Sequence, residues 1–202
     1  MKKLKKMSFH VRKEFILAIL GVLFASYALI FGTLFVEISN LKIDEHHKSI
    51  NKKRDLNSQY QVAKLLSQSK KNAADSLLTF IISSEDSEHY DWAIGLVESH
   101  YKEALNYANV DQSNKAAIEA VLTKDAIVKS DLLEIRADFE IQFDHMMENL
   151  VFKTQSNEES IAQHQLKIAD EVVNRMCTIY KGVVLSAIGL LLGGLGLLFF
   201  KD

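Results

Sequence analysis

The sequence contains no proline, a single cysteine and few glycines. None of its 202 residues is proline, and only eight are glycine. Because proline breaks the interior of a helix, its absence suits a chain built from long, uninterrupted helices. Gly95 is the only glycine between residues 37 and 181, where strands joined by tight turns would need many more. The composition therefore predicts an all-α fold.

The sequence also lacks the common patterns of catalytic and cofactor sites. With Cys177 as its only cysteine, the chain has no internal disulfide and no cysteine-based metal cage. It contains no haem attachment motif, phosphate-binding loop or nucleophile elbow. Its histidines do not form the Glu-x-x-His pairs of a di-iron helix bundle. We therefore expect no enzyme activity, no cofactor and no metal site.

Two apolar segments, residues 15–36 and 182–200, lie near the two ends of the chain. Each is close to the roughly 20 apolar residues that a helix needs to cross the hydrocarbon core of a membrane. We expect both to be transmembrane helices in a lipid bilayer. The remaining segments are then a basic tail (1–14), a helical middle domain (37–181) and a short end (201–202).

The charges before the first span predict its orientation. Six Lys and Arg residues and one acid precede residue 15, and basic residues close to a span stay on the cytoplasmic side. We therefore expect a two-pass protein of the bacterial inner membrane, with both termini in the cytoplasm and residues 37–181 outside. A cleaved signal peptide is the alternative. The first span is longer than a typical signal core, and Ser26 and Ala28 are followed by more apolar residues, which favours a retained anchor.

The middle domain, residues 37–181, is acidic. It contains 17 Lys and Arg residues and 24 Asp and Glu residues, so its net charge is −7. An acidic surface repels phosphate groups. We therefore expect no nucleic-acid partner.

Turn signals divide the middle domain into helices. A first helix is expected over 41–82, and the small and acidic residues 83–88 favour its end and a new helix start. A second helix, about 86–108, ends at the polar residues 109–114. Over residues 128–150, apolar residues recur every three or four positions, which predicts a long helix that continues toward the second span. Together these helices predict an antiparallel four-helix bundle.

The position of the last turn in this bundle has two solutions. The polar run 154–160 is the best local break, and it pairs with a first turn at 67–72. Since helices rise about 1.5 Å per residue, long first and last helices instead place the last turn near Arg136. Both solutions return the chain to the membrane it left. We favour the second, in which long bundle helices are continuous with the two spans.

Part of the middle domain resembles a known sensor family. Residues 78–90 combine an apolar run, a small and acidic turn and an aromatic residue, and Ala93 and residues 101–105 follow. This pattern resembles the extracytoplasmic four-helix-bundle domains of methyl-accepting chemotaxis proteins and sensor histidine kinases. The order of basic tail, span, helical domain and span is also similar. We expect no cytoplasmic output part after the second span, so the resemblance implies sensing that acts through a partner protein.

Three residues are candidates for contact with a ligand. Ligand contacts in the resembling family often use arginines of the first and last bundle helices, which implies Arg54 and Arg136. Trp92 lies close in sequence to Tyr90 and Tyr101. Such an aromatic group favours packing in the core or at a dimer interface, and an aromatic-lined pocket for a small ligand is the alternative. The alternative for the two arginines is an ordinary solvated surface.

Each span carries small residues on one face, at spacings of three and four. They are Ala18, Gly21, Ala25, Ala28 and Gly32 in the first span and Gly182, Ser186, Gly189, Gly193 and Gly196 in the second. Small side chains let helix backbones approach closely in lipid. We expect close packing within one chain, between two copies or against a partner's span. The broad apolar run 139–152 also favours self-association, so we expect a homodimer with coiled-coil packing.

These features favour a chemoreceptor-like sensor or regulatory module in signal transduction. We expect it to sense an extracytoplasmic cue and to act through a membrane signalling partner. A structural or assembly subunit without a ligand is the first alternative. A small two-span, membrane-disrupting effector is the second, suggested by the glycine-rich second span.

Overall fold

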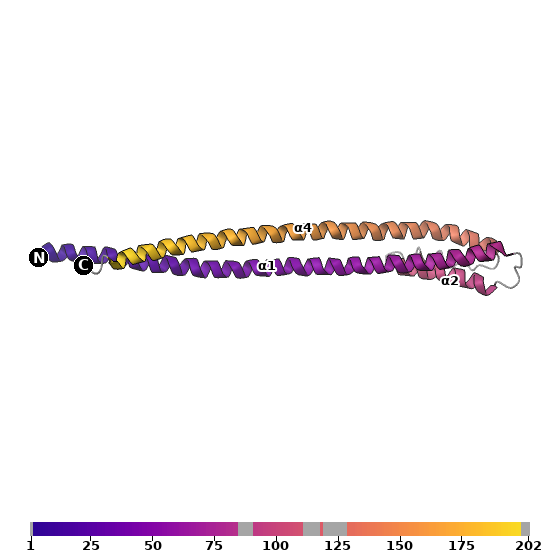
Figure 1. Ribbon diagram of the computed structural model, residues 1–202, viewed down its shortest axis with the longest axis horizontal. Coiled ribbons are helices and arrows are strands. Elements are labelled where there is room, and N and C mark those ends of the chain that lie inside the picture. The colour runs from indigo at the N-terminus through magenta and orange to yellow at the C-terminus, as the bar shows by residue number, and fades with distance from the viewer. Residues whose placement is uncertain (1, 85–90, 111–117, 119–128, 199–202) are drawn as a thin grey trace. The chain divides into compact units, whose positions relative to one another are not determined.

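The computed structural model describes residues 2–84, 91–110, 118 and 129–198, and almost all of them are helical. It contains helices α1 (Lys2–Ser83), α2 (Asp91–Ala108) and α4 (Lys129–Leu198), shown in Figure 1. No strand occurs among these residues, so the all-α expectation is confirmed. Three described helices do not by themselves make up a four-helix bundle, which stays a prediction.

The helix bounds test the turns that the two solutions placed in the chain. Helix α1 runs unbroken through residues 67–72 and α4 runs unbroken through 154–160, so both turns of that solution are wrong. The turn signals after residue 83 and after residue 108 agree with the ends of α1 and α2. The expected turn residues 85–88 and 111–114 lie outside the described residues.

The polar run in α4 is helical, and two of its side chains bond within the helix. The Thr154 hydroxyl donates to the carbonyl oxygen of Leu150 at 2.8 Å, and the Gln155 amide donates to Glu159 Oε1 at 3.2 Å. Such bonds to residues four positions away are compatible with a helix interior. Residues that favour turns in isolation therefore sit here without ending the helix. The bounds of α1 and α4 agree with long first and last helices, but α4 begins at Lys129 and runs unbroken through Arg136, so the turn expected near Arg136 is wrong.

The chain divides into two compact units. Unit 1 comprises residues 1–49 and 163–202, and unit 2 comprises residues 50–162. Helices α1 and α4 each contribute residues to both units, whereas α2 belongs to unit 2. Each helix is therefore continuous across the boundary, although the units are described separately below.

Unit 2 has an apolar core formed by α1, α2 and α4. The largest fully buried apolar side chains are Leu78, Val97, Tyr101, Leu105, Leu132, Phe139 and Met146. The Tyr101 and Phe139 rings pack with centroids 4.2 Å apart, and Phe139 stacks on Phe143 at 5.1 Å. The apolar stripe expected over 128–150 faces this core from Leu132 to Leu150.

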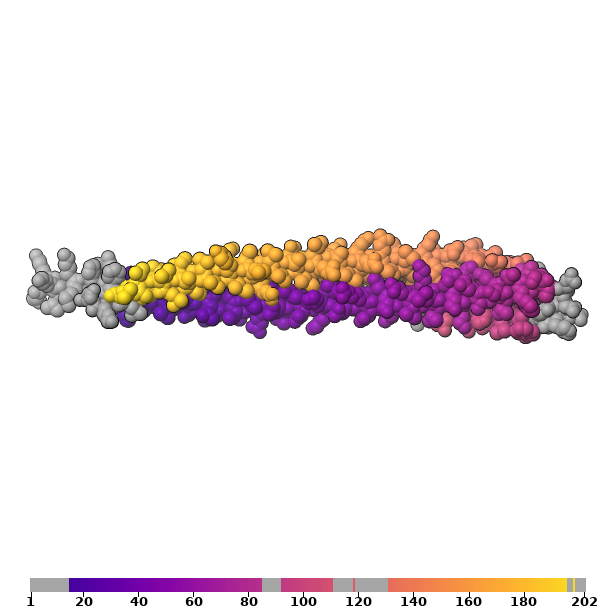
Figure 2. Space-filling view, viewed as in Figure 1, coloured from indigo at the N-terminus to yellow at the C-terminus, as the bar shows by residue number. Residues whose placement is uncertain are grey.

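In unit 1, the N-terminal segment of α1 packs against the C-terminal segment of α4. In Figure 2 the indigo surface of α1 lies against the yellow surface of α4. Small residues such as Gly21, Ala28 and Gly189 face the partner helix, while large apolar residues such as Phe15 and Leu190 face outward. Only 11% and 6% of the most apolar windows of α1 and α4 are buried. Both helices are long and apolar enough to cross a membrane.

Candidate functional site

The two spans approach most closely at Gly21 and Gly189. A methyl group added at Gly21 would lie 2.6 Å from the Gly189 carbonyl oxygen and 2.9 Å from the Gly193 backbone nitrogen. One added at Gly189 would lie 3.0 Å from the Gly21 carbonyl oxygen. A methyl group added at Gly182 would lie 3.7 Å from the Ala28 carbonyl oxygen, which is an ordinary van der Waals contact. Backbone therefore packs on backbone, as small residues permit in a membrane.

Other small residues of the spans face open space instead. A methyl group added at Gly32, Gly193 or Gly194 would meet nothing within 4 Å. Two grooves of about 700 and 730 Å³ run along the spans and share Leu29 and Leu190 in their walls. The expected packing residues that line these grooves are Ala18, Gly21, Ala25, Ala28, Gly32, Gly182, Ser186, Gly189 and Gly193. Gly196 lies in α4, outside the part of the chain whose side chains are described.

A polar cluster joins α1, α2 and α4 in unit 2, and we name it the Asp75 cluster; it comprises Lys71, Asp75, Tyr101, Arg136 and Glu140. The Tyr101 hydroxyl, in α2, donates to Asp75 Oδ1 in α1 at 2.8 Å. Lys71 Nζ donates to Asp75 Oδ2 and to Glu140 Oε1 in α4, both at 2.9 Å. Arg136 Nε lies 3.7 Å from Asp75 Oδ1 and 3.8 Å from Glu140 Oε1. Two cations therefore balance two carboxylates.

The cluster shifts the pKa values of its members in opposite directions. Burial alone would raise the pKa of Asp75, but the hydrogen bonds from Lys71 and Tyr101 and the nearby cations hold it below its usual value. Burial would lower the pKa of Lys71, and its two carboxylate partners outweigh that effect and raise it. The pKa of Tyr101 is raised, first by burial and then by its hydrogen bond to Asp75.

These shifts define a pH window for the stability of unit 2. A lowered Asp75 pKa contributes stability that is present above the unfolded value and is lost as pH falls through the folded value. The raised Lys71 and Tyr101 pKa values contribute stability that is lost as pH rises through the folded values. The cluster therefore stabilises unit 2 most between about pH 4 and pH 10.

The structure does not bring the three candidate ligand contacts together. Arg136 belongs to the Asp75 cluster, where two carboxylates engage it and 43% of its side chain is exposed. Arg54 is exposed on α1, about 30 Å along that helix from Asp75. Trp92 is 61% exposed on α2. The cations offer no shared anion site, and Trp92 does not belong to the core.

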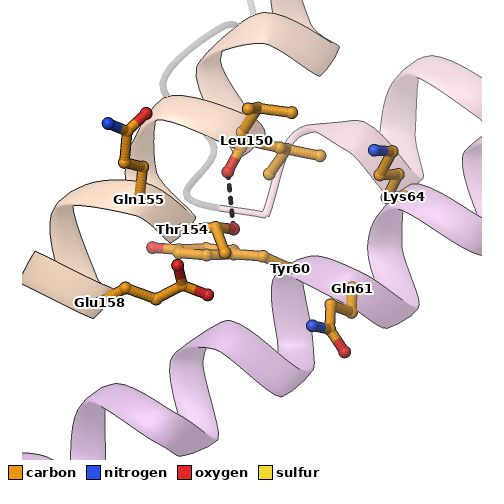
Figure 3. A pocket seen from close by; sticks show the side chains of 8 residues that line it. Tyr60, Gln61, Lys64, Leu150, Thr154, Gln155 and Glu158 are labelled. Carbon is orange, nitrogen blue, oxygen red and sulfur yellow. Dashed lines mark hydrogen bonds between the residues drawn. The ribbon is translucent and has the colours of Figure 1, made fainter. Parts of the chain in front are cut away.

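A groove in unit 2 that the sequence did not indicate lies between α1 and α4, and Figure 3 shows it from close by. It measures about 430 Å³, and its lining residues are Tyr60, Gln61, Lys64, Leu150, Val151, Thr154, Gln155 and Glu158. The Tyr60 ring projects from α1 toward Thr154 and Glu158 of α4 (Figure 3). The groove thus offers an aromatic face, one ammonium, one carboxylate and two amides.

An amide pair next to this groove fixes the register of α1 against α4. The Asn157 amide nitrogen donates to Asn57 Oδ1 at 2.9 Å, across the two helices. This pair is partly buried, and an asparagine pair between helices favours one axial alignment of the two helices. The groove is therefore built on helices whose alignment is specified.

No protein-family model, curated protein or solved structure matches this chain. The resemblance to chemoreceptor sensor domains therefore stays a prediction, and the function is argued from geometry. Among the described residues, no group of three or more His, Cys, Asp and Glu side chains is arranged to hold a metal ion.

Proposed function

We propose that this chain is a membrane-anchored sensor or regulatory module that acts through a partner protein. In this proposal residues 15–36 and 182–200 cross the bacterial inner membrane, and residues 37–181 form an extracytoplasmic four-helix bundle. The observation that carries the proposal is helix continuity. Helices α1 and α4 each run without a break from a membrane-length apolar segment into the core of unit 2.

Continuous helices provide a physical route for a signal. The groove beside Tyr60 is built from α1 and α4, the same two helices that carry the apolar segments. A ligand that binds one arrangement of these helices better than another shifts the population toward it. Helix displacements of about 1–2 Å are typical of such switches. The proposed cue is therefore a small molecule with both an aromatic or apolar part and a charged part.

The test of this function is affinity capture of the full-length protein from native membranes, followed by mass spectrometry. We expect a stoichiometric membrane signalling protein, such as a kinase, chemoreceptor or cyclase. The matched variants are Tyr60→Ala, which opens the groove, and Asp55→Ala, an exposed position on the same helix. We expect Tyr60→Ala to change the recovery of the partner or its response, and Asp55→Ala to leave both unchanged.

A structural or assembly subunit is the second candidate, and the grooves along the spans favour it. Gly32, Gly193 and Gly194 leave open space beside them, which suits the close approach of a further helix. Recovery of the protein alone, as a homo-oligomer, would support this candidate and contradict the sensor proposal. The expected homodimer would then be the assembly itself.

A further inference from the structure

Two histidines from opposite helices face each other in unit 1. His46 of α1 and His164 of α4 are 118 positions apart in sequence, yet their Nδ1 atoms lie 3.1 Å apart. Their ring centroids are 5.1 Å apart, with the ring planes tilted by 49°. Both residues are half-buried. Two imidazole nitrogen atoms, which are common metal ligands, thus lie close together between α1 and α4.

Neighbouring contacts in unit 1 hold the two helices in this register. Lys42 Nζ donates to Glu171 Oε1 at 3.2 Å, and Arg175 donates to Asn40 Oδ1 at 2.6 Å. These pairs lie one to three helical turns from the histidines. The pairing of the two helices therefore helps to position the Nδ1 atoms of His46 and His164.

The separation of the two nitrogen atoms matches that of two ligands on one ion. Bonds of about 2.0–2.1 Å at a tetrahedral angle place two ligand nitrogens about 3.3 Å apart, and bonds at a right angle place them about 2.9 Å apart. The observed 3.1 Å lies between these values. Without an ion, one Nδ1–H donates to the other Nδ1. With an ion, both protons reside on Nε2 and both Nδ1 lone pairs point at the metal.

We propose that His46 and His164 bind one divalent transition-metal ion of the copper, nickel or zinc class through their Nδ1 atoms, joining α1 to α4. Water completes the coordination, and no group of three or more His, Cys, Asp and Glu side chains in the described part of the chain is arranged to hold the ion without it. Copper(II) binds most tightly, as nitrogen ligands follow the usual order of divalent metals. The site goes beyond the proposed function and does not depend on a signalling partner.

The test is copper(II) binding to the purified full-length protein in nanodiscs, followed by electron paramagnetic resonance. A Cys177→Ser background removes the exposed thiol, which would compete for the ion. We expect one bound ion per chain with two coordinated imidazole nitrogens. His46→Gln and His164→Gln should each weaken binding by at least about tenfold. His47→Gln, an exposed neighbour of His46 on α1, should leave the affinity unchanged.

Three results would overturn the proposal. They are the absence of a bound ion, unchanged affinity in the His46→Gln, His164→Gln double variant, and an equal loss in His47→Gln. Circular dichroism checks that each variant keeps the helical content of the parent protein. Should a variant fail to fold, nitrogen hyperfine coupling in the parent protein still counts the imidazole ligands, and a count other than two contradicts the site.

Discussion

Replacing Gly21 with alanine should lower the free energy of unfolding of the detergent-solubilised protein by about 1–3 kcal/mol. The added methyl group would lie 2.6 Å from the Gly189 carbonyl oxygen and 2.9 Å from the Gly193 nitrogen. Both atoms belong to backbone, so no side chain can rotate away and the two helices must separate. Reversible unfolding of the variant and the parent protein measures the difference.

Two glycines of the same spans provide matched controls for this effect. Gly32→Ala and Gly193→Ala each add a methyl group that meets nothing within 4 Å. We expect these variants to change stability by less than about 0.5 kcal/mol. The loss of stability in Gly189→Ala should lie between that of Gly21→Ala and those of the two control variants, because its methyl group would lie 3.0 Å from the nearest backbone atom. Equal losses in Gly21→Ala and Gly32→Ala would contradict the close crossing of the spans.

Replacing Asp75 with alanine should destabilise unit 2 by about 2–3 kcal/mol, between the values for exposed and fully buried ion pairs. The change leaves the buried Tyr101 hydroxyl without its acceptor and removes one of the two carboxylates that bind Lys71. Asp55→Ala, at an exposed position on the same helix, should have little effect. Chemical denaturation of the full-length protein at neutral pH compares the two variants.

The same variant has a pH signature that simple loss of packing would not produce. The lowered pKa of Asp75 means that the parent protein loses stability as pH falls below about 4. We expect Asp75→Ala to remove most of this acid-dependent loss, so the two stability curves converge at low pH. Parallel curves would show that Asp75 contributes no charge-dependent stability.

Much of the fold could be predicted from composition and spacing alone. The absence of proline and the scarcity of glycine predicted helices, and the stripe from Leu132 to Leu150 predicted the core face of α4. One solution wrongly placed a turn at the polar run 154–160, because its residues favour turns in isolation. In the helix, Thr154 bonds to Leu150 and Gln155 to Glu159. Helix length correctly favoured long first and last helices, but it placed the last turn near Arg136, which lies inside α4.

The sites were harder to predict because they depend on the register between distant helices. Arg136 was singled out from the sequence, but nothing in the sequence paired it with Asp75. Lys71 and Glu140 are 69 positions apart, and His46 and His164 are 118 positions apart. The groove beside Tyr60 requires the same information, since it needs α4 to be helical through Glu158.

Site-specific labelling with a membrane-impermeant maleimide tests the two-span arrangement most directly. In a Cys177→Ser background, Gln68→Cys places a thiol at an exposed position in unit 2, and Lys3→Cys places one in the basic tail. The account predicts that spheroplasts label Gln68→Cys at once and label Lys3→Cys only after lysis. Protection of Gln68→Cys in intact spheroplasts, or labelling of Lys3→Cys before lysis, would contradict it.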